Sequence, residues 1–130
     1  MPSDSPLPAE AWLNALSSLP DMGPARLRAL LADRQPEQAW RACLQGKPLP
    51  EVEAVVGGRL LTLTAAWAKA AGQLSVSELW SQLVKEGVQV MGREHSEYPS
   101  CLRDDPDPPL VLFAQGDFQA LAPAPRVAIV

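Results

Sequence analysis

The chain has 130 residues, of which 47% are hydrophobic, and this is enough apolar material for one ordinary domain or two small ones. Its formal net charge is −4: residues 1–75 carry seven basic and seven acidic groups, and residues 76–130 carry four and eight. Nucleic-acid-binding proteins normally show a strongly basic footprint, which neither part shows. Any nucleic-acid site must therefore be local or must lie outside this chain.

The cysteines, the N-terminal residues and the apolar runs indicate where in the cell the protein is expected. Cys43 and Cys101 are far apart and have no metal-ligand spacing, so we expect reduced thiols. The first twelve residues have neither the basic region nor the apolar region of a signal peptide. The longest apolar run, 60–71, is interrupted by Thr62, Thr64 and Lys69. These features predict a cytoplasmic protein without a membrane partner.

Residues 1–72 predict a helical domain whose helices begin at prolines and end at prolines or glycines. Proline suits the first turn of a helix, and glycine suits the residue that follows the last turn. The apolar spacing places helices after Pro8, from Pro24, from Pro36 to Gly46, within 48–58, and over 59–72.

Residues 73–130 show a different pattern. Ser75 and Glu78 form a predicted capping box, and Gly87 ends the helix that they begin. Three β-type runs follow, "VQVM", "LVLFAQGD" and "RVAIV". A proline-rich loop lies between the first and the second. Unbroken apolar runs are typical of strands covered on both faces, as in a parallel sheet. The sequence therefore predicts an α+β chain, with a helical domain over 1–72 and the start of an α/β domain over 73–130. Because the chain ends within a strand signal, we expect it to be the front part of a longer protein.

One block of the sequence carries a family resemblance. Tyr98-Pro99, Leu102, Asp107-Pro108-Pro109, Leu112-Phe113 and Gly116-Asp117 follow one another in order and spacing, together with "LSSLPDMGPARLRALL", "GVQVM" and "VAIV". The chain resembles the N-terminal part of the DNA-processing protein A family (DprA/Smf). That resemblance implies a helix-hairpin-helix or SAM-like domain followed by a truncated Rossmann-like domain.

The same resemblance implies a function. Proteins of this family bind and protect single-stranded DNA during natural transformation and help to load a RecA-type recombinase. They are usually dimers, need no cofactor and are not thought to be enzymes. In the family a Gly-Ser/Thr-Arg turn after the "VAIV" strand holds the DNA backbone, so we expect the main DNA site to lie beyond Val130 and this chain alone to bind single-stranded DNA poorly.

The stretch Leu19-Pro20-Asp21-Met22-Gly23 is the local candidate for DNA contact. A helix-hairpin-helix binds a phosphate through the amides of its turn and the start of its second helix. The candidate DNA-binding residues are Met22, Gly23 and Arg26. Asp21 stands where the usual pattern has glycine; aspartate tolerates the left-handed conformation, but its charge repels a phosphate. A purely structural corner between two helices is the alternative, and the one that we favour.

The remaining polar and aromatic candidates have plainer interpretations. We expect His95 in a surface loop, the carboxylates of Asp104, Asp105 and Asp107 in solvent, and the ring of Tyr98 pinning its loop to the domain. Core packing is expected for the four tryptophans, Trp12, Trp40, Trp67 and Trp80. The sequence suggests no catalytic residue, no metal site and no nucleotide-binding glycine loop; Gly116-Asp117 alone is weak evidence.

Two other functions stay open. Similar opening strands occur in nucleotide phosphoribohydrolases of the lysine-decarboxylase-like type, whose catalytic residues would lie downstream. Alternatively, the helical domain is a module that docks a protein partner. DNA binding by the full-length protein without residues 1–72 would favour the second of these.

Overall fold

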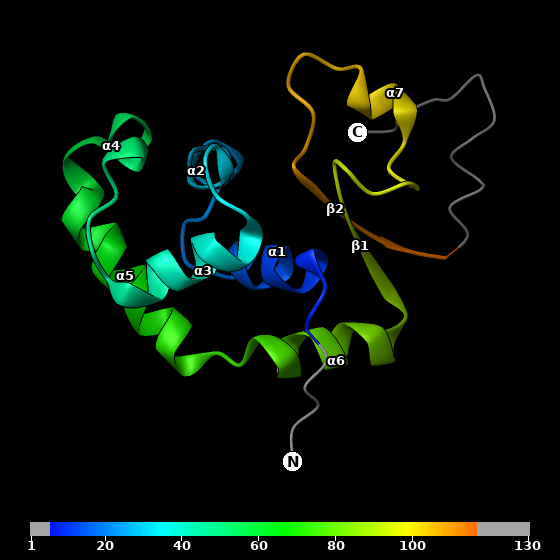
Figure 1. Ribbon diagram of the computed structural model, residues 1–130, viewed down its shortest axis with the longest axis horizontal. Coiled ribbons are helices and arrows are strands. Elements are labelled where there is room, and N and C mark those ends of the chain that lie inside the picture. The colour runs from blue at the N-terminus through cyan, green and yellow to red at the C-terminus, as the bar shows by residue number, and fades with distance from the viewer. Residues whose placement is uncertain (1–5, 117–130) are drawn as a thin grey trace.

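The computed structural model describes residues 6–116, in which helices α1 to α6 are followed by β1, α7 and β2. Figure 1 shows α1 to α5 gathered in one half, the strands and α7 in the other, and α6 running between the two halves. The element bounds are α1 Ala9–Ser17, α2 Pro24–Leu31, α3 Pro36–Gln45, α4 Pro50–Val56, the 3₁₀ turn η1 Gly57–Arg59, α5 Leu60–Gln73, α6 Val76–Glu86, β1 Val88–Gly92, α7 Ser100–Arg103 and β2 Val111–Gln115.

This part of the chain is mostly helical with a small two-stranded antiparallel sheet, which agrees with the α+β class. The predicted division into a 1–72 and a 73–130 domain stays a prediction, as do the helix-hairpin-helix or SAM-like and Rossmann-like identities. The predicted strand 126–130 lies outside the described residues. Within residues 6–116, no helix has both the length and the hydropathy that crossing a bilayer requires.

The helix boundaries follow from local signals. Pro24, Pro36 and Pro50 each occupy the first position of a helix, where the missing N–H is not needed. The Ser75 hydroxyl accepts a hydrogen bond from the Glu78 amide at 3.2 Å, which caps α6 and is one of the two bonds of the predicted capping box. Gly87 ends α6 with φ 75°, a backbone conformation that residues other than glycine adopt with difficulty.

A single hydrophobic core joins the helices. Helix α1 lies at its centre and contacts α3, α6 and β1, while α3 contacts α5 on the other side. Trp67 of α5 and Leu16 of α1 are among the largest fully buried side chains. Val76 of α6 belongs to the same core cluster, and Val111 of β2 packs against it. The core therefore extends across the predicted boundary at residue 72.

The sheet differs from the parallel arrangement that the sequence predicts. Strands β1 and β2 pair antiparallel, with Val90 opposite Phe113 and Met91 opposite Leu112. Val90 and Met91 are both buried although successive strand residues point to opposite faces. Helices α1 and α6 contact β1, and Figure 1 shows the segment 93–110 beyond the end of β1 that is far from α6. Of the unbroken apolar runs from which two-sided burial was expected, "LVLF" contains no buried residue, and its Phe113 is 48% exposed, so that expectation is wrong for β2; "VAIV" lies outside the described residues.

The segment 93–110 is held together by two side chains. Tyr98 is 3% exposed, and its hydroxyl donates to the Pro109 carbonyl at 2.6 Å, which joins two distant residues of this segment; that its ring pins the loop to the domain stays a prediction. The Arg103 guanidinium donates to the carbonyls of Arg93 and His95 at 3.2 and 2.9 Å and lies over the Tyr98 ring. Four residues of this segment form α7, a short helix that the sequence did not predict.

Burial of Cys43 makes the free energy of unfolding depend on pH in the alkaline range. Burial raises the pKa of the Cys43 thiol from 9.0 to about 11, although the charge of Arg34 partly opposes this shift. Between these values the unfolded chain loses the proton and the folded chain keeps it, so the free energy of unfolding falls as pH rises from about 9 to about 11. We expect this fall to be on the order of 2–3 kcal/mol.

Urea titrations at pH 8, 9, 10 and 11 measure this dependence. The Cys43→Ala variant is the control, because it lacks the thiol and keeps every other titrating group. Its stability should be lower by a constant cavity cost but should fall less steeply with pH. Parallel curves for the two proteins would contradict the prediction.

Candidate nucleic-acid interface

The turn between α1 and α2 forms a tight hairpin. The Met22 amide donates to the Leu19 carbonyl at 3.2 Å, and the Gly23 amide donates to the Asp21 carbonyl at 3.1 Å. Asp21 has φ 56°, which confirms that aspartate adopts the left-handed conformation here. Gly23 is extended, with φ −90° and ψ 177°, and directs the chain into Pro24 at the start of α2.

The start of α2 offers hydrogen-bond donors. In the first turn of an α-helix the amides have no acceptor within the helix, and here these are the amides of Ala25 and Arg26. A side chain at Gly23 would meet no atom within 4 Å, so the space in front of this turn is open. Open space beside unpaired amides, at the positive end of a helix, suits a phosphate oxygen.

Three arginines surround the hairpin, and each has a partner within the chain. Arg26 donates to the Asp21 carbonyl at 2.6 Å, and Arg59 of η1 reaches the Asp21 carboxylate at 3.3 Å. Arg28, on α2, forms an ion pair with Asp107 of the segment 93–110. Arg59 therefore offsets the negative charge that sequence reasoning held against this hairpin.

The hairpin is also tied to the core from the side of α5. The indole nitrogen of Trp67 donates to the Pro20 carbonyl at 2.7 Å. Trp67 is 1% exposed, so this bond joins the turn to a rigid, buried side chain. The turn is thus held at Pro20 by the core and at Asp21 by Arg26 and Arg59.

The three predicted DNA-binding residues have different surroundings. Gly23 faces open space, as a phosphate contact requires. Met22 packs against the hydrophobic core, and its amide is used within the hairpin, so its side chain is not presented to a ligand. Arg26 lies beside the hairpin but turns back to the Asp21 carbonyl. Sequence reasoning missed Arg59, because 38 residues separate it from Asp21 and no local pattern connects them.

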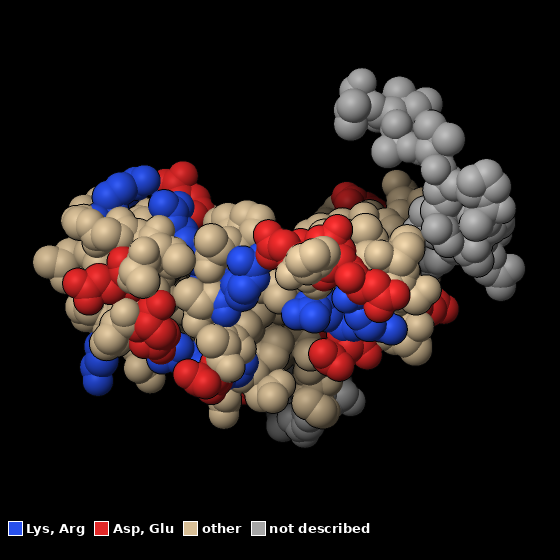
Figure 2. Space-filling model, turned by 90° about the horizontal axis from the view of Figure 1, so that it is seen from above, with Lys and Arg blue, Asp and Glu red and all other residues tan. Residues whose placement is uncertain are grey.

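The charged surface agrees with a local site. On the face shown in Figure 2, Lys and Arg side chains form separate groups interleaved with Asp and Glu, without one continuous basic area. Such a surface provides few neighbouring cations for a nucleic-acid backbone, so any contact depends on the hairpin rather than on a broad electrostatic field.

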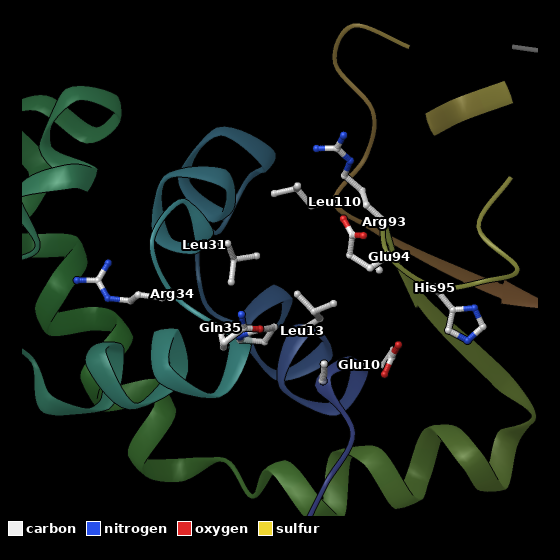
Figure 3. A pocket seen from close by; sticks show the side chains of 12 residues that line it. Glu10, Leu13, Leu31, Arg34, Gln35, Arg93, Glu94, His95 and Leu110 are labelled. Carbon is white, nitrogen blue, oxygen red and sulfur yellow. The ribbon is translucent and has the colours of Figure 1, made fainter. Parts of the chain in front are cut away.

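A cavity of about 460 Å³ lies between α1, the α2–α3 connection and the end of β1 (Figure 3). Glu10, Glu94 and His95 contribute polar groups to its lining. Arg34 also lines it, but Figure 3 shows its guanidinium directed away, and this group forms an ion pair with Glu51. The cavity thus has few convergent polar groups, and the negative charges of Glu10 and Glu94 are opposed by that of Arg93, which also lines it, so it does not define a ligand class.

The remaining candidates fall as follows. His95 lies in the loop that follows β1, as expected, and is half-buried beside this cavity, and its Nδ1 accepts from the Glu97 amide at 3.0 Å. Trp40 and Trp67 are buried in the core as predicted, and Trp12 and Trp80 pack partly buried against it. Asp104, Asp105 and Asp107 are exposed. Within residues 6–116, no three or more His, Cys, Asp or Glu side chains are grouped to hold a metal ion.

Comparison of the chain with protein-family models, with curated proteins and with solved structures gives no match. The interpretation of the hairpin therefore depends on its own geometry and on the sequence resemblance.

Proposed function

We propose that the chain is the N-terminal part of a single-stranded-DNA-binding protein that acts in DNA uptake and recombination, and that its α1–α2 hairpin contributes one weak phosphate contact. The observation that supports this proposal is the open position in front of Gly23, beside the first-turn amides of α2. Recombinase loading, dimer formation and the absence of enzymatic activity are parts of the proposal that the sequence resemblance alone supports.

The physical argument concerns how a phosphate would be held. The first-turn amides donate to anions, and the helix dipole favours negative charge at this end. Arg26 and Arg59 lie close enough to Asp21 to bond it, and either arginine can exchange that partner for a phosphate oxygen. Asp21 keeps a carboxylate in the same place, so the contact is weak.

The affinity and its dependence on salt test the proposal. We expect the 130-residue chain to bind a fluorescent oligothymidine with a Kd on the order of 10⁻⁴ M at near-physiological salt, as non-specific phosphate contacts do. One neutralised phosphate gives a slope of about −0.7 in a plot of log K against log salt. Tight binding, or binding that ignores salt, would exclude a single weak phosphate contact.

Substitution of Gly23 separates a DNA contact from a structural corner. Aspartate at this N-cap position should stabilise α2 by a few tenths of a kcal/mol, since the site is open and its φ of −90° suits any residue. The same aspartate places a negative charge against the phosphate, so Gly23→Asp should weaken oligothymidine binding by about fivefold or more at low salt. Gly23→Asn is the matched control, because it has the same size and capping ability without the charge.

Anisotropy titrations and thermal melts of the three proteins decide between the two interpretations. A phosphate contact predicts that Gly23→Asp binds clearly more weakly than Gly23→Asn, while both melt at or slightly above the temperature of the unsubstituted chain. Equal binding by both variants would leave the hairpin as a corner between packed helices. In that case the chain would fit a protein-docking module better, an interpretation that the mixed charges in Figure 2 also favour.

A further inference from the structure

The pairing of Arg28 has a consequence for nucleic-acid binding. Arg28 and Asp107 are 79 residues apart in the sequence, yet their side chains form an ion pair between α2 and the segment 93–110. Arg28 stands two positions after Arg26 on the helix whose first turn forms the candidate phosphate site. Asp107 therefore places a carboxylate on a cation of the same helix, in the way that a phosphate oxygen would.

Asp107 is presented by a stretch of chain that is already fixed in shape. Its amide donates to the Asp105 carboxylate at 2.9 Å, which closes a local turn. Pro106 and Pro108 flank it, Pro108 is buried, and the neighbouring Pro109 carbonyl is held by the Tyr98 hydroxyl. Because these bonds fix the backbone on both sides of Asp107, its contact with Arg28 loses little conformational entropy.

We propose that Asp107 acts as an internal competitor that occupies Arg28 and lowers the affinity of α2 for nucleic-acid phosphates. The proposal rests on the proposed function, since it names a second cation for the same nucleic-acid chain, on another side of α2 from Arg26, and the group that blocks it. Phosphate binding at Arg28 requires this ion pair to open. Release of the segment 93–110 from α2 would then make Arg28 available to nucleic-acid phosphates in addition to Arg26.

The expected effect is modest, because both side chains are largely accessible to solvent, with 47% of the Arg28 and 74% of the Asp107 side chain exposed. Exposed ion pairs of this kind change equilibria by a factor of about two to five, and salt screens them. We therefore expect Asp107→Asn to raise the affinity for oligothymidine by about two- to fivefold at low salt. The gain should shrink as the salt concentration rises.

A double-substitution cycle separates this contact from a general change in charge. Asp104→Asn removes one negative charge from the same loop without touching Arg28, so it is the matched control and should raise affinity less than Asp107→Asn. Arg28→Gln should have little effect on DNA binding in the unsubstituted chain, where Asp107 occupies Arg28. In the Asp107→Asn background the same change should remove the whole gain. Additive effects, or equal gains from both loop variants, would overturn the proposal.

A second readout keeps the test decisive if DNA binding is absent. Amide hydrogen exchange of Asp104, Asp105 and Asp107 should speed up in Arg28→Gln and in Asp107→Asn to a similar extent, and no further in the double variant. If exchange speeds up as expected but none of the proteins binds oligothymidine, the proposed function is refuted while the contact between Arg28 and Asp107 is confirmed. Unchanged exchange in both single variants would refute the contact itself.

Discussion

Replacement of Trp67 by alanine is expected to lower the free energy of unfolding by about 3–5 kcal/mol. The side chain is 1% exposed and is among the largest that are fully buried, so its removal leaves a large cavity in the core where α5 contacts α3. Domains of this size are commonly stable by only 5–15 kcal/mol, roughly. Urea unfolding followed by circular dichroism should therefore show a much earlier midpoint, with part of the chain unfolded before denaturant is added.

The milder variant Trp67→Phe isolates the bond to the hairpin. It keeps an aromatic ring in the core but removes the indole N–H that donates to the Pro20 carbonyl. We expect a loss of about 1–2 kcal/mol, which corresponds to a melting temperature lower by roughly 4–8 °C for a chain of this length. Amide exchange at residues 19–23 should rise together with this loss.

Trp40→Phe is the matched control for this variant. Trp40 is also buried, in α3, and the substitution removes the same atoms without changing the environment of the Pro20 carbonyl. It should cost less stability, because no bond to the hairpin is lost, and exchange in the hairpin should stay slow relative to the rest of the chain. If both variants increased hairpin exchange equally, Trp67 would act only through packing and not through its bond to Pro20.

Helix boundaries were predictable because their causes are local in sequence. A proline fixes its own φ and lacks its own N–H, so Pro24, Pro36 and Pro50 mark helix starts wherever the rest of the chain lies. Gly46 and Gly87 end helices for an equally local reason, since both adopt positive φ. The short helix α7 was missed because its four residues lie inside a proline-rich stretch that is typical of a loop.

The surroundings of the hairpin were not predictable in the same way. Their contacts join residues that are distant in sequence, namely Arg59 with Asp21, Trp67 with Pro20, and Arg28 with Asp107. Each partner is an ordinary arginine, tryptophan or aspartate in a pattern that many helices and loops share. Only the packing of α5 and of the segment 93–110 brings them to the turn, and packing is a property of the whole chain.

The direction of the strands shows the same limit. The run "LVLF" indicated burial on both faces, and a parallel sheet with helices on each side is one way to achieve that. Here the chain returns after residues 93–110 and pairs antiparallel, and none of the four residues of the run is buried. Neither the direction of this strand nor its burial is determined by its local pattern, because both depend on the path of the connection and on what packs against the sheet.

Replacement of Tyr98 by alanine is expected to release the segment 93–110. The ring is 3% exposed, and its hydroxyl is the donor that holds the Pro109 carbonyl. Burial raises the pKa of this hydroxyl above 10.0, with Arg93 and Arg103 opposing the shift, so the ring is held as the neutral phenol. Loss of the ring and the bond should cost about 3–5 kcal/mol within this region, and limited proteolysis should cut near residues 99–109 first.

Hydrogen exchange in Tyr98→Ala also tests the predicted boundary between residues 72 and 73. If 1–72 is an independent domain, fast exchange should be confined to β1, β2 and the segment between them, and the amides of α3 and α5 should stay as protected as in the unsubstituted chain. The contacts of α1 with both α6 and β1 argue for the opposite result, in which protection falls throughout α1. Tyr98→Phe is the control, since it removes only the hydroxyl and should leave the ring packed. Loss of protection that reaches α5 would show that one cooperative core spans the boundary, and the helical part would then not be a separable module.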